Sequence, residues 1–344
     1  MKHFNLLSLR GAFFATKQSP HKRGELHRPV RVAFYPAKQS LSKSRLLRAI
    51  ALAMTLIFLT SCASVDLNAP VPVYATGVDP NAWASIPAGN FLSGQEAKPS
   101  TIDYDFQMMV TDVTVTQYIA FLNAALADRT LKLDGAKIVG TYPGDEFRGY
   151  KHEIKIEAGD YIYVPLDDPA SRFTFNGSSF SVMPGWEDHP MTDVSWFGAW
   201  GFCGYYKYRL PTELEWEKAA RGSQDDRPFP WGEEILRNNA NYYTSRDPFE
   251  DMRSFGSRTT PVGLYNGRTY DNYQTLDSAS PYGLYDMAGN VWQWVGDITP
   301  NFSDRFMHGG SKGTYNMDLR IWVRNSAPPM YYSPSVGFRC VREQ

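Results

Sequence analysis

The pattern of hydrophobic and polar positions along the chain predicts a few helices and many short strands. Hydrophobic and polar residues alternate over residues 108–116, which is typical of a β-strand. Over residues 117–126 the hydrophobic residues follow helical spacing, so we expect a helix capped by Thr116. Residues 195–206, rich in aromatic side chains, and residues 211–222, which begin with Pro-Thr-Glu, are predicted to form two further helices.

Residues 280–297 (SPYGLYDMAGNVWQWVGD) follow neither a helical nor a simple strand period. Gly283 and Gly289 permit backbone angles that other residues avoid. Trp292 and Trp294 alternate as on a short strand, with one indole on each face or both packed at their edges. We therefore predict a buried irregular loop that leads into a strand. Buried irregular backbone needs polar partners or a bound ion.

Two long stretches differ from this pattern. Residues 128–187 contain short alternating runs, at 161–164 and 173–175, separated by turn residues, which predicts inserted β-hairpins. Such an insertion either determines specificity or elaborates the surface without consequence, and both interpretations stay open. Residues 227–279 are predicted to be nearly all loop.

Residues 283–294 (GLYDMAGNVWQW) resemble the signature GLxDMxGNVWEW of the sulfatase-modifying-factor family, to which the formylglycine-generating enzyme belongs. The resemblance covers about residues 83–343 and implies an α+β, formylglycine-generating-enzyme-type fold. This fold is related to C-type lectins and has long loops and little regular secondary structure. The companion motifs, in the family's order, are IPAGNF at 86–91, VTVTQY at 113–118, HPMTDVSW at 189–196, RLPTELEWE at 209–217, PWG at 230–232, HGGS at 308–311 and GFR at 337–339.

The charge of the chain is unevenly distributed. Residues 1–62 carry 11 basic residues and one acidic residue, whereas the remainder carries 24 basic and 35 acidic residues, a net charge of −11. An acidic body argues against binding to nucleic acid. The basic segment 43–48 precedes an apolar run at 49–59 that is too short to span a bilayer, as in a signal peptide.

Residues 59–62 (LTSC) resemble the bacterial lipobox, which implies that Cys62 is lipidated and becomes the first mature residue. The alternative is an ordinary signal or core segment with an incidental cysteine. Because residue 63 is Ala rather than Asp, the resemblance implies a lipid anchor in the outer membrane of a bacterial cell envelope, on its periplasmic or surface face.

The predicted organisation is a leader and signal peptide at 1–62, a flexible tether rich in Ala, Pro and Val at 63–81, and a sulfatase-modifying-factor domain at 82–344. Residues 1–42 are too long for an ordinary n-region, so we expect them to be a disordered leader or to lie upstream of the true start. The lipid would hold the domain at the membrane surface.

The family resemblance implies structural calcium. At one site Asp286 and Gln293 would give side-chain oxygens, and Gly289 and Val291 would give backbone carbonyls. The family usually has glutamate where this chain has Gln293, so weaker binding is expected, and the alternative is a hydrogen-bonded loop. A second ion would be bound by Asn241 and the Tyr242 carbonyl, together with ligands from residues 251–255.

The family also places a disulfide where this chain has Cys203 and Cys340, and the alternative is two buried free thiols. The formylglycine-generating enzyme further needs two cysteines shortly after Gly-Gly-Ser, which bind copper(I). Residues 309–320 contain no cysteine, so neither that oxidase chemistry nor a copper site is expected.

Other catalytic patterns are weak. The three histidines beyond the leader are isolated and lack ligand spacing, so no iron site is expected; they are His152, His189 and His308. Glu213 and Glu217 lie four residues apart at a helix start, where acids are favoured by the helix dipole as well as in acid–base catalysis.

In this family the substrate binds beside the stretch equivalent to residues 309–325. Seven residues are candidates for lining this ligand-binding cleft, although the last three could also pack as an ordinary alternating strand. They are Ser311, Lys312, Tyr315, Asn316, Arg320, Trp322 and Arg324.

Two functions from different classes remain. The first is a non-catalytic binding or scaffold module that holds a protein or a glycan. In this it resembles gliding-motility and type IX secretion lipoproteins and the ligand-binding variable proteins. The second is an oxidoreductase that acts on a protein side chain with an altered metal site. The absence of the two cysteines favours the first function. The fold alone does not decide between the two functions.

Overall fold

A computed structural model describes residues 70–146, 149, 154–223, 225–250, 258–300 and 303–343. The described residues all belong to one compact unit, Asp66–Gln344. The predicted signal peptide, Cys62, His152 and residues 251–255 lie outside the described residues. Every helix in the described part of the chain is too short or too polar to cross a lipid bilayer.

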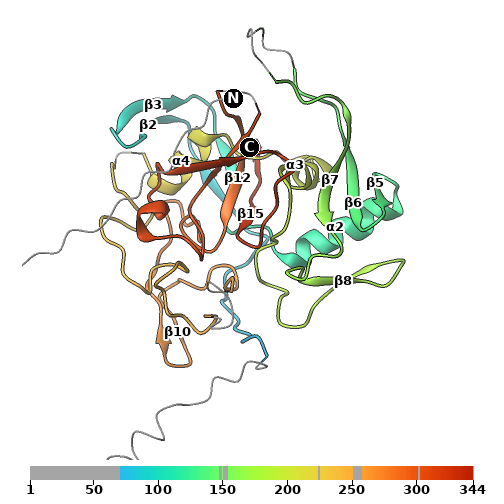
Figure 1. The fold of residues 1–344 in the computed structure, drawn as a ribbon. Coiled ribbons are helices and arrows are strands. Elements are labelled where there is room, and N and C mark those ends of the chain that lie inside the picture. The colour runs from blue at the N-terminus through green and yellow to red at the C-terminus, as the bar shows by residue number, and fades with distance from the viewer. Residues whose placement is uncertain are drawn as a thin grey trace, which may run out of the picture. The chain divides into compact units, whose positions relative to one another are not determined.

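A four-stranded sheet of order β14-β13-β12-β15 forms the centre of the domain (Figure 1). Antiparallel pairing joins β12 (Trp292–Ile298) to β13 (Arg305–His308), which also pairs with β14 (Arg324–Ala327). Strand β15 (Val336–Phe338) runs parallel to β12. Both indoles of the predicted strand are buried, and Trp294 Nε1 donates to the Val194 carbonyl at 3.2 Å. The two indoles lie on one face of the strand, and Gln293 and Val295 on the other face are also buried, so residues 292–295 are covered on both faces.

A second sheet joins the two ends of the domain. Its middle strand, β4 (Phe106–Met109), pairs with β1 (Trp83–Ile86) and β16 (Val341–Glu343), both antiparallel. The strand predicted at 108–116 is wrong beyond Met109. There the carbonyls of Met109 and Val110 accept hydrogen bonds from the Arg339 guanidinium at 3.2 Å, so a side chain replaces the neighbouring strand. A separate hairpin consists of β2 (Gly89–Ser93) and β3 (Lys98–Ile102).

Three helices occur where they were predicted, at α2 (Val115–Ala127), α3 (Trp196–Tyr205) and α4 (Glu213–Arg221). The predicted cap of α2 is wrong by two residues. Thr114 caps the helix, since its hydroxyl accepts the Gln117 N–H and the Gln117 side chain accepts the Thr114 N–H. The hydroxyl of Thr116 donates instead to the Glu187 carbonyl. Thr212 and Glu215 form the same reciprocal cap on α4.

The hairpins predicted within residues 128–187 are confirmed. Strands β5 (Leu131–Asp134), β6 (Lys137–Tyr142) and β7 (Gly159–Pro165) form an antiparallel sheet beside α3, and β8 (Phe173–Phe175) pairs with β9 (Phe180–Val182). This region lies on the right of Figure 1. Among the described residues of 227–279, the regular structure is a two-residue hairpin of β10 (Thr269–Tyr270) and β11 (Tyr273–Gln274), so the loop prediction holds.

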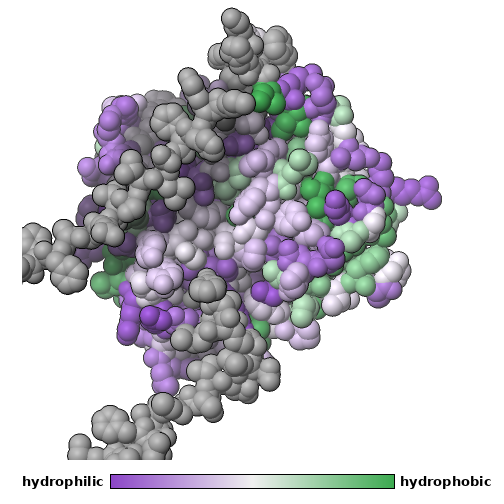
Figure 2. Space-filling view, viewed as in Figure 1, coloured by the Kyte–Doolittle hydropathy of each residue, from purple (hydrophilic) through white to green (hydrophobic). Residues whose placement is uncertain are grey.

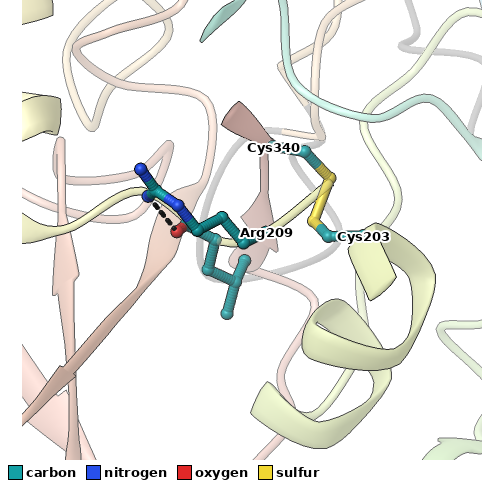
Figure 3. The surroundings of a disulfide bond; sticks show 4 residues. Cys203, Arg209 and Cys340 are labelled. Carbon is teal, nitrogen blue, oxygen red and sulfur yellow. Dashed lines mark hydrogen bonds between the residues drawn. A yellow bond between two sulfur atoms is a disulfide. The ribbon is translucent and has the colours of Figure 1, made fainter. Parts of the chain in front are cut away.

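A disulfide between Cys203 and Cys340 joins helix α3 to the C-terminal segment (Figure 3), which confirms the pairing. Both cysteines are fully buried in the larger hydrophobic core. On the face shown in Figure 2, hydrophilic residues are interspersed with separate hydrophobic areas. The domain is an α+β structure with short elements and long loops, as expected.

Candidate functional site

The candidate cleft is built by the loop that follows β13. This loop starts with Gly309 and Gly310, both at positive φ, and a Cβ on Gly310 would lie 2.8 Å from Leu319 Cδ1. The chain can therefore fold back on itself only with glycine there. The Lys312 N–H donates to the Asn290 carbonyl at 3.0 Å, which attaches the loop to the predicted irregular segment at 280–291.

Lys312, on this loop, and Asp193 are a second notable pair of polar side chains. The Lys312 ammonium donates to the Ser335 hydroxyl at 3.0 Å, and burial lowers its pKa to about 8. Asp193 is only 1% exposed, and its Oδ1 atom has no hydrogen-bond partner among the described residues. Burial raises the Asp193 pKa to about 6, against the opposing effect of the positive charges of Arg172 and Lys312. A buried acid and a desolvated amine thus lie near each other.

An exposed aromatic surface lies on the same loop. Tyr315 is 58% exposed, and its ring centroid is 5.0 Å from that of Tyr243, which is 51% exposed. The Tyr243 N–H donates to the Thr314 carbonyl at 3.0 Å, so the pair is held by the backbone. Met317, which is 58% exposed, follows on the short 3-10 helix η1 (Asn316–Leu319), and the exposed Arg320 comes after it. We call Tyr243, Tyr315, Asn316, Met317 and Arg320 the Tyr315 surface.

The remaining predicted cleft residues have other surroundings. Ser311 is buried beneath the loop. The guanidinium carbons of Arg221 and Arg320 lie over the Trp322 ring, 5.5 and 5.9 Å from its centroid. Arg324 lies in β14, whereas Arg320 and Trp322 precede that strand, so the three do not form one alternating strand.

Arg324 belongs to a separate ionic cluster. Its Nη1 lies 3.0 Å from Glu213 Oε2, and His308 Nε2 lies 2.9 Å from Glu213 Oε1. Burial alone would raise the pKa of Glu213, but the neighbouring His308 and Arg324 lower it overall. Glu217 instead accepts from the Gly94 N–H and pairs with Arg221. The two helix-start carboxylates therefore bind different partners.

His189 lies apart from His308. It packs against Trp186 and Phe249, and burial lowers its pKa to about 3, so it stays neutral.

The first implied calcium site fits the ion poorly at one ligand. Gln293 Oε1 accepts hydrogen bonds from Trp216 Nε1 at 2.8 Å and from Arg339 Nε at 2.9 Å, which occupy both lone pairs of an amide oxygen. Gln293 Nε2 donates to the Asp286 carbonyl, and Asp286 Oδ2 accepts from the Gly263 N–H. These contacts correspond to the hydrogen-bonded loop rather than to an ion cage.

The second implied site fits a calcium ion better, as the surroundings of Asn241 indicate. Asn241 is buried, and its Oδ1 atom has no hydrogen-bond partner among the described residues, while its Nδ2 donates to the Arg258 carbonyl. A buried amide oxygen without a donor suits a calcium ligand. The Tyr242 carbonyl accepts one hydrogen bond, from the Ser245 N–H, and retains a second lone pair.

Two cleft residues were missed by sequence reasoning. Asp193 lies within the HPMTDVSW motif, and its φ of +56° is unusual for a residue other than glycine. Tyr243 lies in the loop-rich stretch, far from residue 315 in sequence. The one carboxylate of the motif HPMTDVSW was the available signal for Asp193, whereas no local pattern indicates Tyr243.

The described part of the chain provides no free thiol. The sequence contains three cysteines, of which Cys203 and Cys340 are bonded to each other and Cys62 lies outside the described residues. The loop after Gly309-Gly310 therefore presents an amine, hydroxyls and aromatic rings.

A family model described as Sulfatase-modifying factor enzyme 1-like domain matches residues 73–344, and the chain belongs to this family. The formylglycine-generating enzyme of Thermomonospora curvata is 37% identical over 193 residues, which are 48% of this chain and 59% of that protein. The inactive C-alpha-formylglycine-generating enzyme 2 of Bos taurus is 32% identical over 161 residues, 44% of this chain and 50% of that protein.

The serine/threonine-protein kinase pkn1 of Chlamydia caviae is 33% identical over 190 residues, 50% of this chain and 27% of that protein. The chain thus spans between about a quarter and three-fifths of the length of these relatives. Among solved structures, PvdO from Pseudomonas aeruginosa has a TM-score of 0.49 at 21% identity, covering 80% of this chain and 100% of that one.

Proposed function

We propose that this protein is a non-catalytic binding module that holds a protein partner on the Tyr315 surface. The observation that carries the proposal is the chemistry of the loop after Gly309-Gly310, which lacks cysteine and exposes an aromatic pair. The relatives include both an enzyme and a protein named inactive. The choice between a catalytic and a non-catalytic function therefore depends on this chain's own residues.

The composition of the Tyr315 surface favours a protein as the ligand. Tyrosine and arginine are enriched at the energetically dominant positions of protein interfaces, and methionine adapts to irregular partners. All three occur here within a few residues of one another, on a loop fixed by backbone hydrogen bonds. A surface whose backbone is already ordered loses little conformational entropy on binding.

The proposal includes a lipid anchor at Cys62. A lipid on Cys62 would hold the domain at the outer membrane, and residues 63–81 would let it reach a partner in the same envelope. Metabolic labelling with an alkyne fatty acid should mark the wild-type chain but not Cys62→Ser. Equal labelling of both would contradict the anchor.

The catalytic alternative is tested directly. The purified chain is incubated with copper(I), oxygen and a Cys-x-Pro-x-Arg peptide, and mass spectrometry follows conversion of the thiol to an aldehyde. We expect no conversion, with a known formylglycine-generating enzyme as the positive control. Turnover would overturn the proposal.

The partner is sought with a photo-crosslinking amino acid in place of Tyr315 in the native envelope. The same amino acid at Tyr331, which is 45% exposed and outside the Tyr315 surface, is the matched control. We expect a crosslinked protein at position 315 and none at position 331. Identical crosslinks at both positions would reject the Tyr315 surface as the interface.

A further inference from the structure

A second site lies at the other end of the central strand β12. A cavity of about 710 Å³ is bordered by the end of β6 with residues 144–146, helix α3 and the last residues of β12. Its lining includes Tyr104, Tyr142, Trp200, Asp297 and Arg305. Register places Arg305 opposite Ile298, whereas the Gly309-Gly310 loop follows His308, which is opposite Gln293. The cavity is therefore separate from the candidate cleft.

Two further cavities border the first. A neighbouring cavity of about 680 Å³ shares Tyr104 and Arg209 with it, and a third of about 440 Å³ shares Arg209 and Glu343 with the second. We call these three together the Arg209 groove. Each cavity is large enough for a small ligand, and their succession suits a ligand made of several linked units.

The charges that line the first cavity favour a neutral ligand. Three acids, Asp145, Glu146 and Asp297, lie beside two bases, Arg209 and Arg305, so the wall carries little net charge and that charge is negative, which disfavours an anion. A cation is disfavoured by Arg305, which is fully buried and pairs with Asp145 at 2.7 Å through Nη2 alone. Its Nε and Nη1 have no hydrogen-bond partner among the described residues, and they require acceptors.

Neutral hydroxyl groups can form hydrogen bonds with both the acidic and the basic side chains of the cavity. A hydroxyl accepts from an arginine and donates to a carboxylate, directly or through an ordered water. Asp297 Oδ2 already accepts from the Glu213 N–H at 2.6 Å, so Oδ1 is the oxygen of this carboxylate that a ligand hydroxyl would reach. Tyr104, which is 42% exposed, and Trp200 add aromatic rings to the lining, and an aromatic ring can pack against the C–H groups of a sugar.

A peptide fits the groove less well. Peptides that bind grooves beside a sheet usually add a strand to an open edge. The strand that borders this groove, β16, pairs with β4, and on its other side Val341 exchanges both backbone hydrogen bonds with Arg209. From these observations we infer that the Arg209 groove binds a neutral oligosaccharide. This inference does not depend on the Tyr315 surface.

The test uses the full-length chain purified in a detergent without a sugar headgroup. Calorimetric titrations use cellohexaose, maltohexaose, mannohexaose and chitohexaose, each with its monosaccharide. We expect saturable binding of at least one hexasaccharide and at least about tenfold weaker binding of its monosaccharide, because the groove spans several units. No binding of any hexasaccharide, or binding only of an anionic oligosaccharide or a peptide on a parallel array, would overturn the inference.

Variants locate the site. Tyr104→Ala should weaken binding at least about tenfold. Tyr104→Phe should retain binding although it loses the hydrogen bond to Glu215, since the ring rather than that bond contacts the sugar. A Cβ on Gly296 would meet atoms no closer than 3.6 Å, so Gly296→Phe can be accommodated and should block the cavity. Tyr331→Ala is the matched control. Unchanged binding in Tyr104→Ala and Gly296→Phe would contradict the assignment.

Discussion

Arg339 donates a hydrogen bond from Nε to Oε1 of Gln293 at 2.9 Å, and both side chains are fully buried. The same guanidinium donates to Asp112 Oδ1 at 3.1 Å and to the Tyr285 carbonyl at 2.8 Å. One side chain thus connects the end of β4, the irregular loop and the C-terminal segment. In this chain a hydrogen-bonded arginine and glutamine stand where the family resemblance implies an ion cage.

Replacing Arg339 with methionine should therefore destabilise the protein strongly. It removes the partner of the fully buried Asp112, whose pKa burial already raises to about 8, and breaking such a buried pair costs about 3–5 kcal/mol in the free energy of unfolding. Urea unfolding measures this change. Arg342→Met is the matched control, because Arg342 is half-buried and bonds the Gln107 side chain, and it should cost no more than about 1 kcal/mol. Equal losses in the two variants would reject the role of Arg339.

Removal of the disulfide should also destabilise the domain. The bond closes a loop of 137 residues, and the chain-entropy model assigns about 4–5 kcal/mol to such a closure. The double variant Cys203→Ser, Cys340→Ser should unfold at correspondingly lower urea concentration. Because both cysteines are fully buried, reductant should act on the wild type only after unfolding. Cys62→Ser should leave the unfolding midpoint unchanged, and a matching loss in that variant would argue against the assignment.

Asp193 should make stability depend on pH. Its pKa is about 6 in the folded protein, above the usual 3.8, because burial disfavours the charged form. Between about pH 4 and 6 the folded protein holds a proton that the unfolded chain has lost, so this contribution to stability falls as pH rises.

The variant Asp193→Asn removes that dependence. Asparagine tolerates the positive φ of this position, so the variant should become more stable than wild type by up to about 3 kcal/mol at pH 7 and equal to it near pH 4. Urea unfolding from pH 4 to 7 tests this. Asp134→Asn, at an exposed position that ends β5, should show no such divergence. A constant difference at every pH would contradict the prediction.

Calcium content distinguishes the two implied sites. We expect one ion per chain, because Asn241 offers a buried oxygen without a donor whereas the Gln293 oxygen is already doubly bonded. Elemental mass spectrometry of the purified protein gives the ratio, and Asn241→Leu should reduce it to zero. A ratio of two, or a ratio unaffected by Asn241→Leu, would contradict this assignment.

The sequence by itself determined the features that depend on near neighbours. The helices α2, α3 and α4 and the hairpins of residues 128–187 follow from periodicity, caps and turns, which act over a few residues. The cap of α2 was misplaced by two residues because both Thr114 and Thr116 could serve, and only packing chose between them: Thr116 bonds Glu187, which lies far away in sequence. The motifs, which occur in the family's order even where periodicity is absent, indicated the family. The family resemblance in turn implied the cysteine pairing.

Tertiary structure alone decided the sites. Lys312 lies near Asp193, and Tyr243 beside Tyr315, because loops distant in sequence converge there, and no local pattern encodes such pairs. The strand predicted at 108–116 ends at Met109. There Arg339, more than two hundred residues away, donates hydrogen bonds to the carbonyls of Met109 and Val110. Buried polar groups must find partners wherever the fold provides them. In a domain of long loops, those partners come from distant segments, and they determine what each polar residue can do.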